Sequence, residues 1–210
     1  MILLIKILFS LLEYPLWYKI SQKVFNKNNL YKILAQEYLQ LKGSESILDI
    51  GCGTANVLDV FREKITYVGF DSNLKYIKYA IKNTIQSKHT VKLFNQMIET
   101  ATVTKFGAFD FVIAVGVLHH LDDNAALDLF KIAFDALKPR GKLITIDPTW
   151  NISNSWISKF LTSYDRGQYI RDSKQYKVLG QQVFKKISMN IREDLIRVSQ
   201  SNCILVCEKR

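Results

Sequence analysis

The stretch Ser46-Ile-Leu-Asp-Ile-Gly-Cys-Gly-Thr54 decides the fold. It begins as a short apolar run that contains one acid, Asp49, and two glycines separated by a single residue follow at once. An apolar run of this length predicts a buried strand, and closely spaced glycines predict a tight turn. Because residues 56–61 then resume helical spacing, we expect a strand, a Gly-rich turn and a helix in succession.

Strand and helix patterns alternate on both sides of this unit. Apolar residues recur at helical spacing from Leu30 to Leu41, and Gly43 follows as a helix stop. Five alternations of strand and helix predict an open α/β sheet with helices on both faces. We expect helices around residues 74–85 and 127–137, and strands at residues 46–50, 65–70, 91–94, 109–115 and 142–146.

The end of the chain has a different strand pattern. Residues 187–191 alternate between apolar and polar side chains, as an edge strand does, whereas residues 203–207 are apolar throughout. We therefore expect the chain to close with an antiparallel pair. The complete prediction is a mostly parallel, doubly wound, seven-stranded sheet with an antiparallel C-terminal strand.

Charge and cysteine content limit the class of partner. The net charge of +10 attracts anions, but Lys and Arg are spread along the 210 residues, which argues against a dedicated nucleic-acid arm. The cysteines are Cys52, Cys203 and Cys207, an odd number without a Cys-x-x-Cys pair. Neither a disulfide framework nor a metal site is expected, and a reducing, cytoplasmic setting fits best.

The first twelve residues are a compositional anomaly. Met1 to Leu12 is apolar on every side, with Lys6 as its one charge. A helix ending before Pro15 would be about 21 Å long, short of a bilayer core of about 30 Å. No small-residue cleavage site follows, which argues against a secretory signal. Two interpretations stay open: a lid helix packed on the domain, or peripheral contact of residues 1–20 with the inner face of a membrane.

The Gly-rich turn predicts a ligand site. Gly51 and Gly53 let a ligand approach the backbone closely, and ligands of open α/β sheets bind at the carboxyl ends of the strands. Asp71 ends the second expected strand, about 20 residues past the turn, where a carboxylate can accept hydrogen bonds from both ribose hydroxyls. A dinucleotide fingerprint would need Gly or Ala where this chain has Asn56, so an NAD-dependent oxidoreductase is disfavoured.

Four segments carry a more specific resemblance. Ile47 to Thr54 resembles the S-adenosylmethionine (SAM) motif of class I methyltransferases, with Ala55 in place of the third glycine. Residues 67–72, 109–122 and 137–143 resemble that family's later motifs in the family's order. The resemblance is close over residues 41–146 and implies a bacterial enzyme that methylates small molecules. We expect a helical lid segment over residues 1–42 and a SAM-binding domain over residues 43–210. The loss of strand patterns after Asp147 predicts a substrate-side insertion at about 148–180.

The resemblance implies a set of cofactor contacts. Gly51 and Gly53 would line the methionine end of SAM, and Asp49 would contact its amino group. Asp71 would hold the ribose. Gln96 would accept a hydrogen bond from the adenine amino group, and Met97 and Ile98 would sandwich the adenine ring. Plain core packing of Met97 and Ile98 stays an open alternative. The complete expected cofactor set is Asp49, Gly51, Cys52, Gly53, Asp71, Ser72, Gln96, Met97, Ile98 and Val115.

The expected chemistry requires little beyond alignment. Methyl transfer from a sulfonium is an in-line displacement, so the enzyme holds the acceptor close and excludes water. A base is needed only for a hydroxyl or a protonated amine, and His119 and His120 are the candidates by pKa and location. We favour His120 as the catalytic base. The alternative is that both histidines shape the turn before the helix at Asp122.

The acceptor is not identified by the sequence. Residues 163–171 resemble an element that recurs in bacterial proteins of this family, and Arg166, Tyr169 and Arg171 would select a carboxylate or phosphate. The alternative is a surface loop tied by ion pairing of Asp165 with Arg166. We expect a small acceptor, anionic or lipid-linked. The competing functions are a catalytically silent SAM- or nucleotide-binding module and an RNA or protein methyltransferase.

Overall fold

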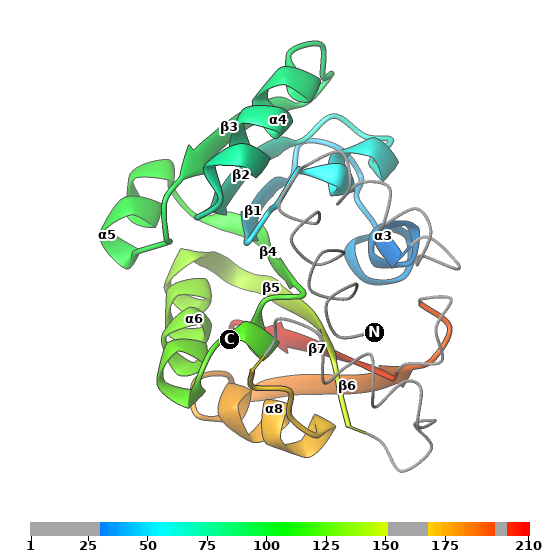
Figure 1. The fold of residues 1–210 in the computed structure, drawn as a ribbon, viewed down its shortest axis with the longest axis vertical. Coiled ribbons are helices and arrows are strands. Elements are labelled where there is room, and N and C mark those ends of the chain that lie inside the picture. The colour runs from blue at the N-terminus through cyan, green and yellow to red at the C-terminus, as the bar shows by residue number, and fades with distance from the viewer. Residues whose placement is uncertain (1–29, 151–167, 196–200) are drawn as a thin grey trace, which may run out of the picture.

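The computed structural model describes residues 30–150, 168–195 and 201–210. These residues form a seven-stranded sheet in the order β3-β2-β1-β4-β5-β7-β6 (Figure 1). The first five strands are parallel, and β7 pairs antiparallel with both β5 and β6, which confirms the predicted fold class. The strands are β1 (Ser46–Ile50), β2 (Thr66–Asp71), β3 (Thr90–Asn95), β4 (Phe109–Val115), β5 (Leu137–Pro148), β6 (Lys186–Arg192) and β7 (Asn202–Glu208).

The strand order reverses at β1. This strand pairs in parallel with β2 on one side and with β4 on the other, so the chain crosses the sheet between β3 and β4. The loops that leave the carboxyl ends of β1 and β4 therefore diverge at this point. Such a switch point opens a crevice in α/β sheets, and the Gly-rich turn follows β1 directly.

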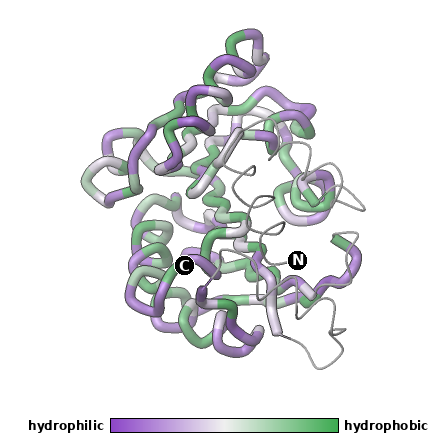
Figure 2. Tube along the Cα trace, in the orientation of Figure 1, coloured by the Kyte–Doolittle hydropathy of each residue, from purple (hydrophilic) through white to green (hydrophobic). Residues whose placement is uncertain are grey.

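Helices cover both faces of the sheet, as predicted. α3 (Leu30–Ile33), the π-helical turn η1 (Leu34–Leu39), the 3-10 turn η2 (Asn56–Val60) and α4 (Leu74–Thr84) share one apolar cluster with Ile47. α5 (Thr100–Val103), α6 (Asp123–Ala136) and α8 (Ser173–Gln181) share a second cluster with Leu48. Successive residues of β1 thus enter opposite halves of the core, because side chains alternate along a strand. Figure 2 shows hydrophobic and hydrophilic residues alternating around α6, as one buried helix face requires.

Some boundaries differ from the prediction. β5 begins at Leu137, where the sequence predicted Lys142, because Leu137 pairs with Phe109 across a local shift in register. The helix expected after the Gly-rich turn is a short 3-10 turn. The sequence did not predict α5, α8 or the single turns η3 (Thr104–Phe106) and η4 (Leu118–His120).

α8 lies within the range assigned to a substrate-side insertion. It begins with a capping box between Asp172 and Gln175, and it packs against α6, β6 and β7. This helix therefore belongs to the layer on the sheet. Residues 151–167, which make up most of the expected insertion, lie outside the described residues.

The expected N-terminal lid is described only from Leu30 onward, where α3 and η1 pack on the sheet. Residues 1–29 lie outside the described residues. Within the described ranges, no helix combines the length and apolar character needed to cross a membrane.

Candidate functional site

The Gly-rich turn is a backbone bend over the end of β2. The N–H groups of Gly51 and Cys52 both donate to the carbonyl oxygen of Phe70, at 2.8 and 3.0 Å. Gly51, Gly53 and Ala55 have φ angles of +73°, +54° and +56°, in the left-handed region. Glycine adopts this region without steric cost, so the two glycines permit the bend.

Asp71 meets this bend directly. Its Oδ2 accepts a hydrogen bond from the Gly53 N–H at 2.9 Å, and its Oδ1 accepts one from the Asn73 N–H at 2.7 Å. The Gly-rich turn and the Asp71 carboxylate, which the sequence analysis assigned to one ligand site, are therefore adjacent. Each carboxylate oxygen has a further acceptor position, so both oxygens can still accept a hydroxyl. Ser72, the next residue, is exposed.

Two glycines of the site make room for protein side chains. A Cβ at Gly51 would lie 2.7 Å from Val117 Cγ2, so the loop after β4 uses the clearance that the sequence analysis assigned to a ligand. A Cβ at Gly69 would lie 2.8 Å from Cys52 Sγ. Cys52 is accordingly buried against β2, and burial raises the pKa of its thiol. Its side chain is a packing element of the bend.

Asp49 lies on β1 beneath the bend and is 5% exposed. The Tyr67 hydroxyl donates a hydrogen bond to its Oδ2 at 2.5 Å. Burial raises the pKa of Asp49 to about 7; the hydrogen bond from Tyr67 opposes this rise, and the charge of Asp71 adds to it. The sequence analysis missed Tyr67, which reads as an ordinary apolar strand residue.

The loop after β4 brings the two predicted histidines together. Their rings lie 4.0 Å apart, with His119 buried and His120 exposed. Nδ1 of His119 lies 2.9 Å from Oδ1 of Asp147, which also accepts the His119 backbone N–H. His119 is thus fixed within the structure, and His120 is the histidine that a solute can reach. Asp147 was not predicted, although its place at the end of β5 could have identified it.

The residues expected around adenine follow β3. Gln96 is exposed, Met97 is 69% exposed, and Ile98 packs partly buried against the second apolar cluster. Core packing therefore accounts for Ile98 and not for Met97. Val115, at the end of β4, is half-buried.

Arg171 does not face an acceptor site, contrary to the expectation. Its side chain is buried, and the guanidinium donates to Asp123 and to three backbone carbonyls, those of Leu118, Tyr169 and Leu121. Its donors are used to fix the loop after β4. Tyr169 is partly exposed, whereas Arg166 lies outside the described residues.

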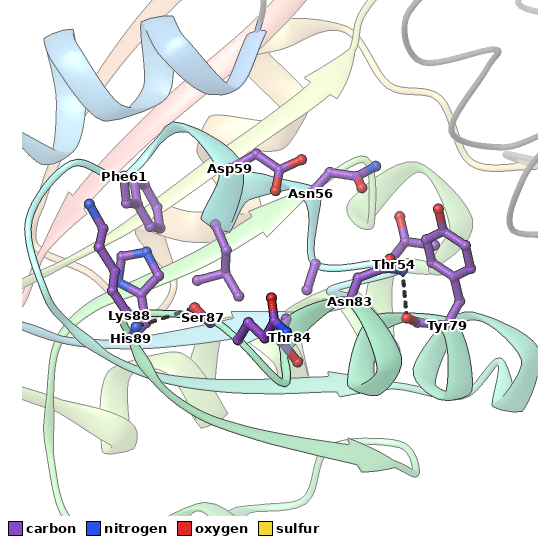
Figure 3. Close-up of a pocket in the computed structure, with 13 residues that line it drawn as sticks. Thr54, Asn56, Asp59, Phe61, Tyr79, Asn83, Thr84, Ser87, Lys88 and His89 are labelled. Carbon is purple, nitrogen blue, oxygen red and sulfur yellow. Dashed lines mark hydrogen bonds between the residues drawn. The ribbon is translucent and has the colours of Figure 1, made fainter.

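A pocket of about 290 Å³ borders the far end of the bend. Figure 3 shows Asn56 and Asp59 on one side and α4 residues Tyr79, Asn83 and Thr84 on the other. None of the expected cofactor residues lines it. The pocket is therefore separate from the contacts made by Asp49 and Asp71. Among the described residues, no group of His, Cys, Asp and Glu could hold a metal ion.

Comparison with known proteins finds a matching family and several curated relatives. A family model described as a methyltransferase domain matches residues 24–184. Phosphoethanolamine N-methyltransferase 1 of Zea mays is 31% identical over 113 residues, which are 53% of this chain and 22% of that protein. Phosphoethanolamine N-methyltransferase 1 of Triticum aestivum is 26% identical over 74% of this chain and 31% of its own length. The chain thus spans between about a fifth and a third of the length of these curated relatives.

Two solved structures show the same fold. The SAM-dependent methyltransferase SibL in its apo form has a TM-score of 0.65 at 15% identity, over 92% of this chain and 56% of that one. Phosphoethanolamine N-methyltransferase 2 of Haemonchus contortus, in complex with SAM, has a TM-score of 0.62 at 15% identity, over 86% and 52%.

Proposed function

Because the chain belongs to the methyltransferase domain family, we propose that it transfers a methyl group from SAM to a small-molecule acceptor. The observation that carries the proposal is the hydrogen bond of 2.9 Å from the Gly53 N–H to Asp71 Oδ2, together with buried Asp49, on which the charge of Asp71 acts. The backbone of the Gly-rich turn and the carboxylates of Asp49 and Asp71 thus lie together at the switch point of the sheet. SAM needs this combination, because it is a nucleoside that carries a cationic amino acid.

The residues fit SAM in the following way. Asp71 accepts the ribose hydroxyls through the remaining acceptor positions of its oxygens. Asp49 accepts the ammonium of the methionine moiety, and Gly51, two residues further along, remains exposed although Val117 packs against it. The wider proposed cofactor set also includes Cys52, Gly53, Ser72, Gln96, Met97, Ile98 and Val115. Cys52 contributes backbone, since its thiol is buried.

The reaction needs an aligned acceptor and a dry site. A lone pair of the acceptor forms a bond to the methyl carbon while the carbon–sulfur bond breaks, and the electron pair of that bond remains on sulfur. Where the acceptor is a hydroxyl or a protonated amine, exposed His120 removes the proton. The contact of His119 with Asp147 holds the histidine pair in place.

The acceptor is proposed to be a small anionic or lipid-linked molecule. The net charge of +10 favours an anion, and phosphoethanolamine, named in several relatives, is the first compound to assay. Residues 1–20 are proposed to bring the enzyme to a membrane surface, on the ground of their apolar composition. Flotation with liposomes tests this second point, and equal flotation of the full chain and of a chain without residues 1–20 would reject it.

Two measurements test the proposed function. Calorimetry with SAM and S-adenosylhomocysteine should show binding of both, whereas a dinucleotide enzyme would bind NAD and neither of these. A screen with SAM as donor, across amine, sugar and lipid acceptors, should then yield a methylated product. Binding without any product across the screen would favour the silent binding module.

A further inference from the structure

Tyr67 and Asp49 form a buried pair on neighbouring strands. Tyr67 is fully buried, and its hydroxyl lies 2.5 Å from Asp49 Oδ2. Tyr67 is opposite Ile47 in the parallel register, and Asp49 is opposite Gly69. The two side chains are therefore diagonal neighbours on one face of the sheet, and the missing side chain at Gly69 makes room for Cys52 beside them.

Among the described residues, the titratable groups that act on this pair carry no positive charge. The titratable groups that act on the pair are Asp71 and Cys52, with Tyr31 acting on Tyr67. The structure gives Asp49 no ion pair among the described residues. A buried carboxylate beside a second carboxylate is costly to ionise unless a cation arrives. The ammonium of a bound ligand would supply that cation.

The tyrosine has one chemical role available in this pair. Burial raises the pKa of Tyr67 well above its usual value, so the hydroxyl stays protonated and acts as a hydrogen-bond donor. Because Oδ2 of Asp49 already accepts from Tyr67, Oδ1 has more acceptor capacity left for a ligand. A phenylalanine at position 67 would preserve the ring and remove this donor.

We infer that Tyr67 is a positioning residue of the cofactor site, which fixes Asp49 and makes the affinity for SAM depend on ionisation of that carboxyl. The inference rests on the proposed function, since it assumes that SAM is the ligand. Below neutral pH, Asp49 becomes protonated and the attraction for the ammonium is lost. Loss of the Tyr67 hydroxyl moves this protonation to higher pH, because a hydrogen bond that favours the charged form has been removed.

The experiment compares two ligands across pH 5.5–7.5. SAM carries the ammonium, whereas 5′-methylthioadenosine keeps the nucleoside and lacks the amino acid part. Dissociation constants are measured by calorimetry for the wild-type protein, Tyr67→Phe and Tyr176→Phe. Tyr176 is a matched control because it is similarly buried, and its hydroxyl donates to the carbonyl of Pro148 on β5, two strands away from the strand of Asp49.

The expected result has three parts. The affinity of the wild-type protein for SAM falls by up to about tenfold per pH unit below pH 7, while that for 5′-methylthioadenosine stays constant. Tyr67→Phe shifts the SAM profile upward by about one pH unit, which weakens binding about fivefold at pH 7. Tyr176→Phe keeps the wild-type profile.

Different failures have different meanings. If both ligands bind but Tyr67→Phe retains the wild-type profile, the inference is overturned and the proposed function stands. The same holds if both ligands show one pH dependence. If neither ligand binds any of the three proteins, the proposed function is wrong and the inference fails with it.

Discussion

The Arg171 guanidinium donates two hydrogen bonds to a single oxygen of Asp123, from Nη2 at 2.7 Å and from Nε at 3.0 Å. Asp123 is the first residue of α6, and Arg171 precedes the cap of α8. The pair therefore joins the starts of two helices that pack on the same face of the sheet. The remaining donors of Arg171 bind backbone carbonyls, including those of Leu118 and Leu121. Because these residues flank His119 and His120, Arg171 fixes the loop that carries both histidines.

Replacing Arg171 by Met should destabilise the fold by about 2–4 kcal/mol. The change removes the side-chain donor of the Leu121 carbonyl and leaves the Leu118 carbonyl with the Leu121 N–H alone, and the loss of a donor to a buried acceptor is costly. Urea unfolding measures the loss. Lys131→Met is the matched control, since Lys131 pairs with Asp128 on the exposed side of α6 and should contribute less than about 1 kcal/mol. A similar loss in both variants would contradict the role assigned to Arg171.

Replacing Asp71 by Ala should weaken SAM binding by at least about tenfold, because ribose loses its charged acceptor. The same change removes the acceptor of the Gly53 and Asn73 N–H groups, so a stability loss of about 1–2 kcal/mol should accompany it. Calorimetry and urea unfolding measure the two effects. Asp128→Ala, which removes an exposed carboxylate of α6, should change neither. Undiminished affinity in Asp71→Ala would remove Asp71 from the cofactor site.

Replacing Gly69 by Ala should displace the Gly-rich turn, because Gly69 on β2 packs against Cys52 of that turn. The new methyl would lie 2.8 Å from Cys52 Sγ and 2.9 Å from Leu93 Cδ2, so Cys52 must shift. We expect a stability loss of about 1–3 kcal/mol together with weaker SAM binding. Gly180→Ala in α8 introduces a milder contact, 3.0 Å from Ile187 Cδ1 of β6, and should leave SAM binding unchanged. Equal affinity in both variants would show that the bend tolerates movement of Cys52.

The contact between the bend and Asp71 could be predicted because it follows from topology. Ile50 ends β1 and pairs with Phe70, so the residues after each must emerge side by side at one edge of the sheet. Any right assignment of two adjacent parallel strands predicts this proximity. The predicted strands at 46–50 and 65–70, which match β1 and β2 to within one residue, were enough to make that assignment.

Other features depend on information that the sequence does not display. The Tyr67 contact requires the exact register of β1 and β2, and a shift of one residue would place the hydroxyl on the opposite face. Arg171 was expected to select the acceptor, and only the carbonyls assembled around it explain why it is buried. The α8 helix was missed because several of its residues are polar and exposed, which weakens the periodic pattern.

Replacing Asp49 by Asn should stabilise the protein at neutral pH and leave its stability in acid nearly unchanged. The pKa of Asp49 rises from 3.8 to about 7 on folding, mainly through burial. The folded state therefore binds a proton more tightly than the unfolded state, and the wild-type protein loses stability as pH rises from about 4 to 7. Asn has no charge to bury, so the variant gains on the order of a few kcal/mol over this range. Urea unfolding at pH 4, 5.5 and 7.5 measures the gain.

The Asp110→Asn variant should change stability in the opposite direction to Asp49→Asn as the pH rises. Burial raises the pKa of Asp110, but hydrogen bonds from Lys138 and Ser46 and the charge of Lys138 outweigh it, and the pKa is lowered. A lowered pKa contributes stability that is present above the unfolded value and is lost as pH falls through the folded one. Asp110→Asn should therefore destabilise most at pH 7.5 and least in acid, where Asp49→Asn also has its smallest effect. Parallel pH profiles for the two variants would mean that Asp49 is ionised at little cost, and that its surroundings hold a positive charge.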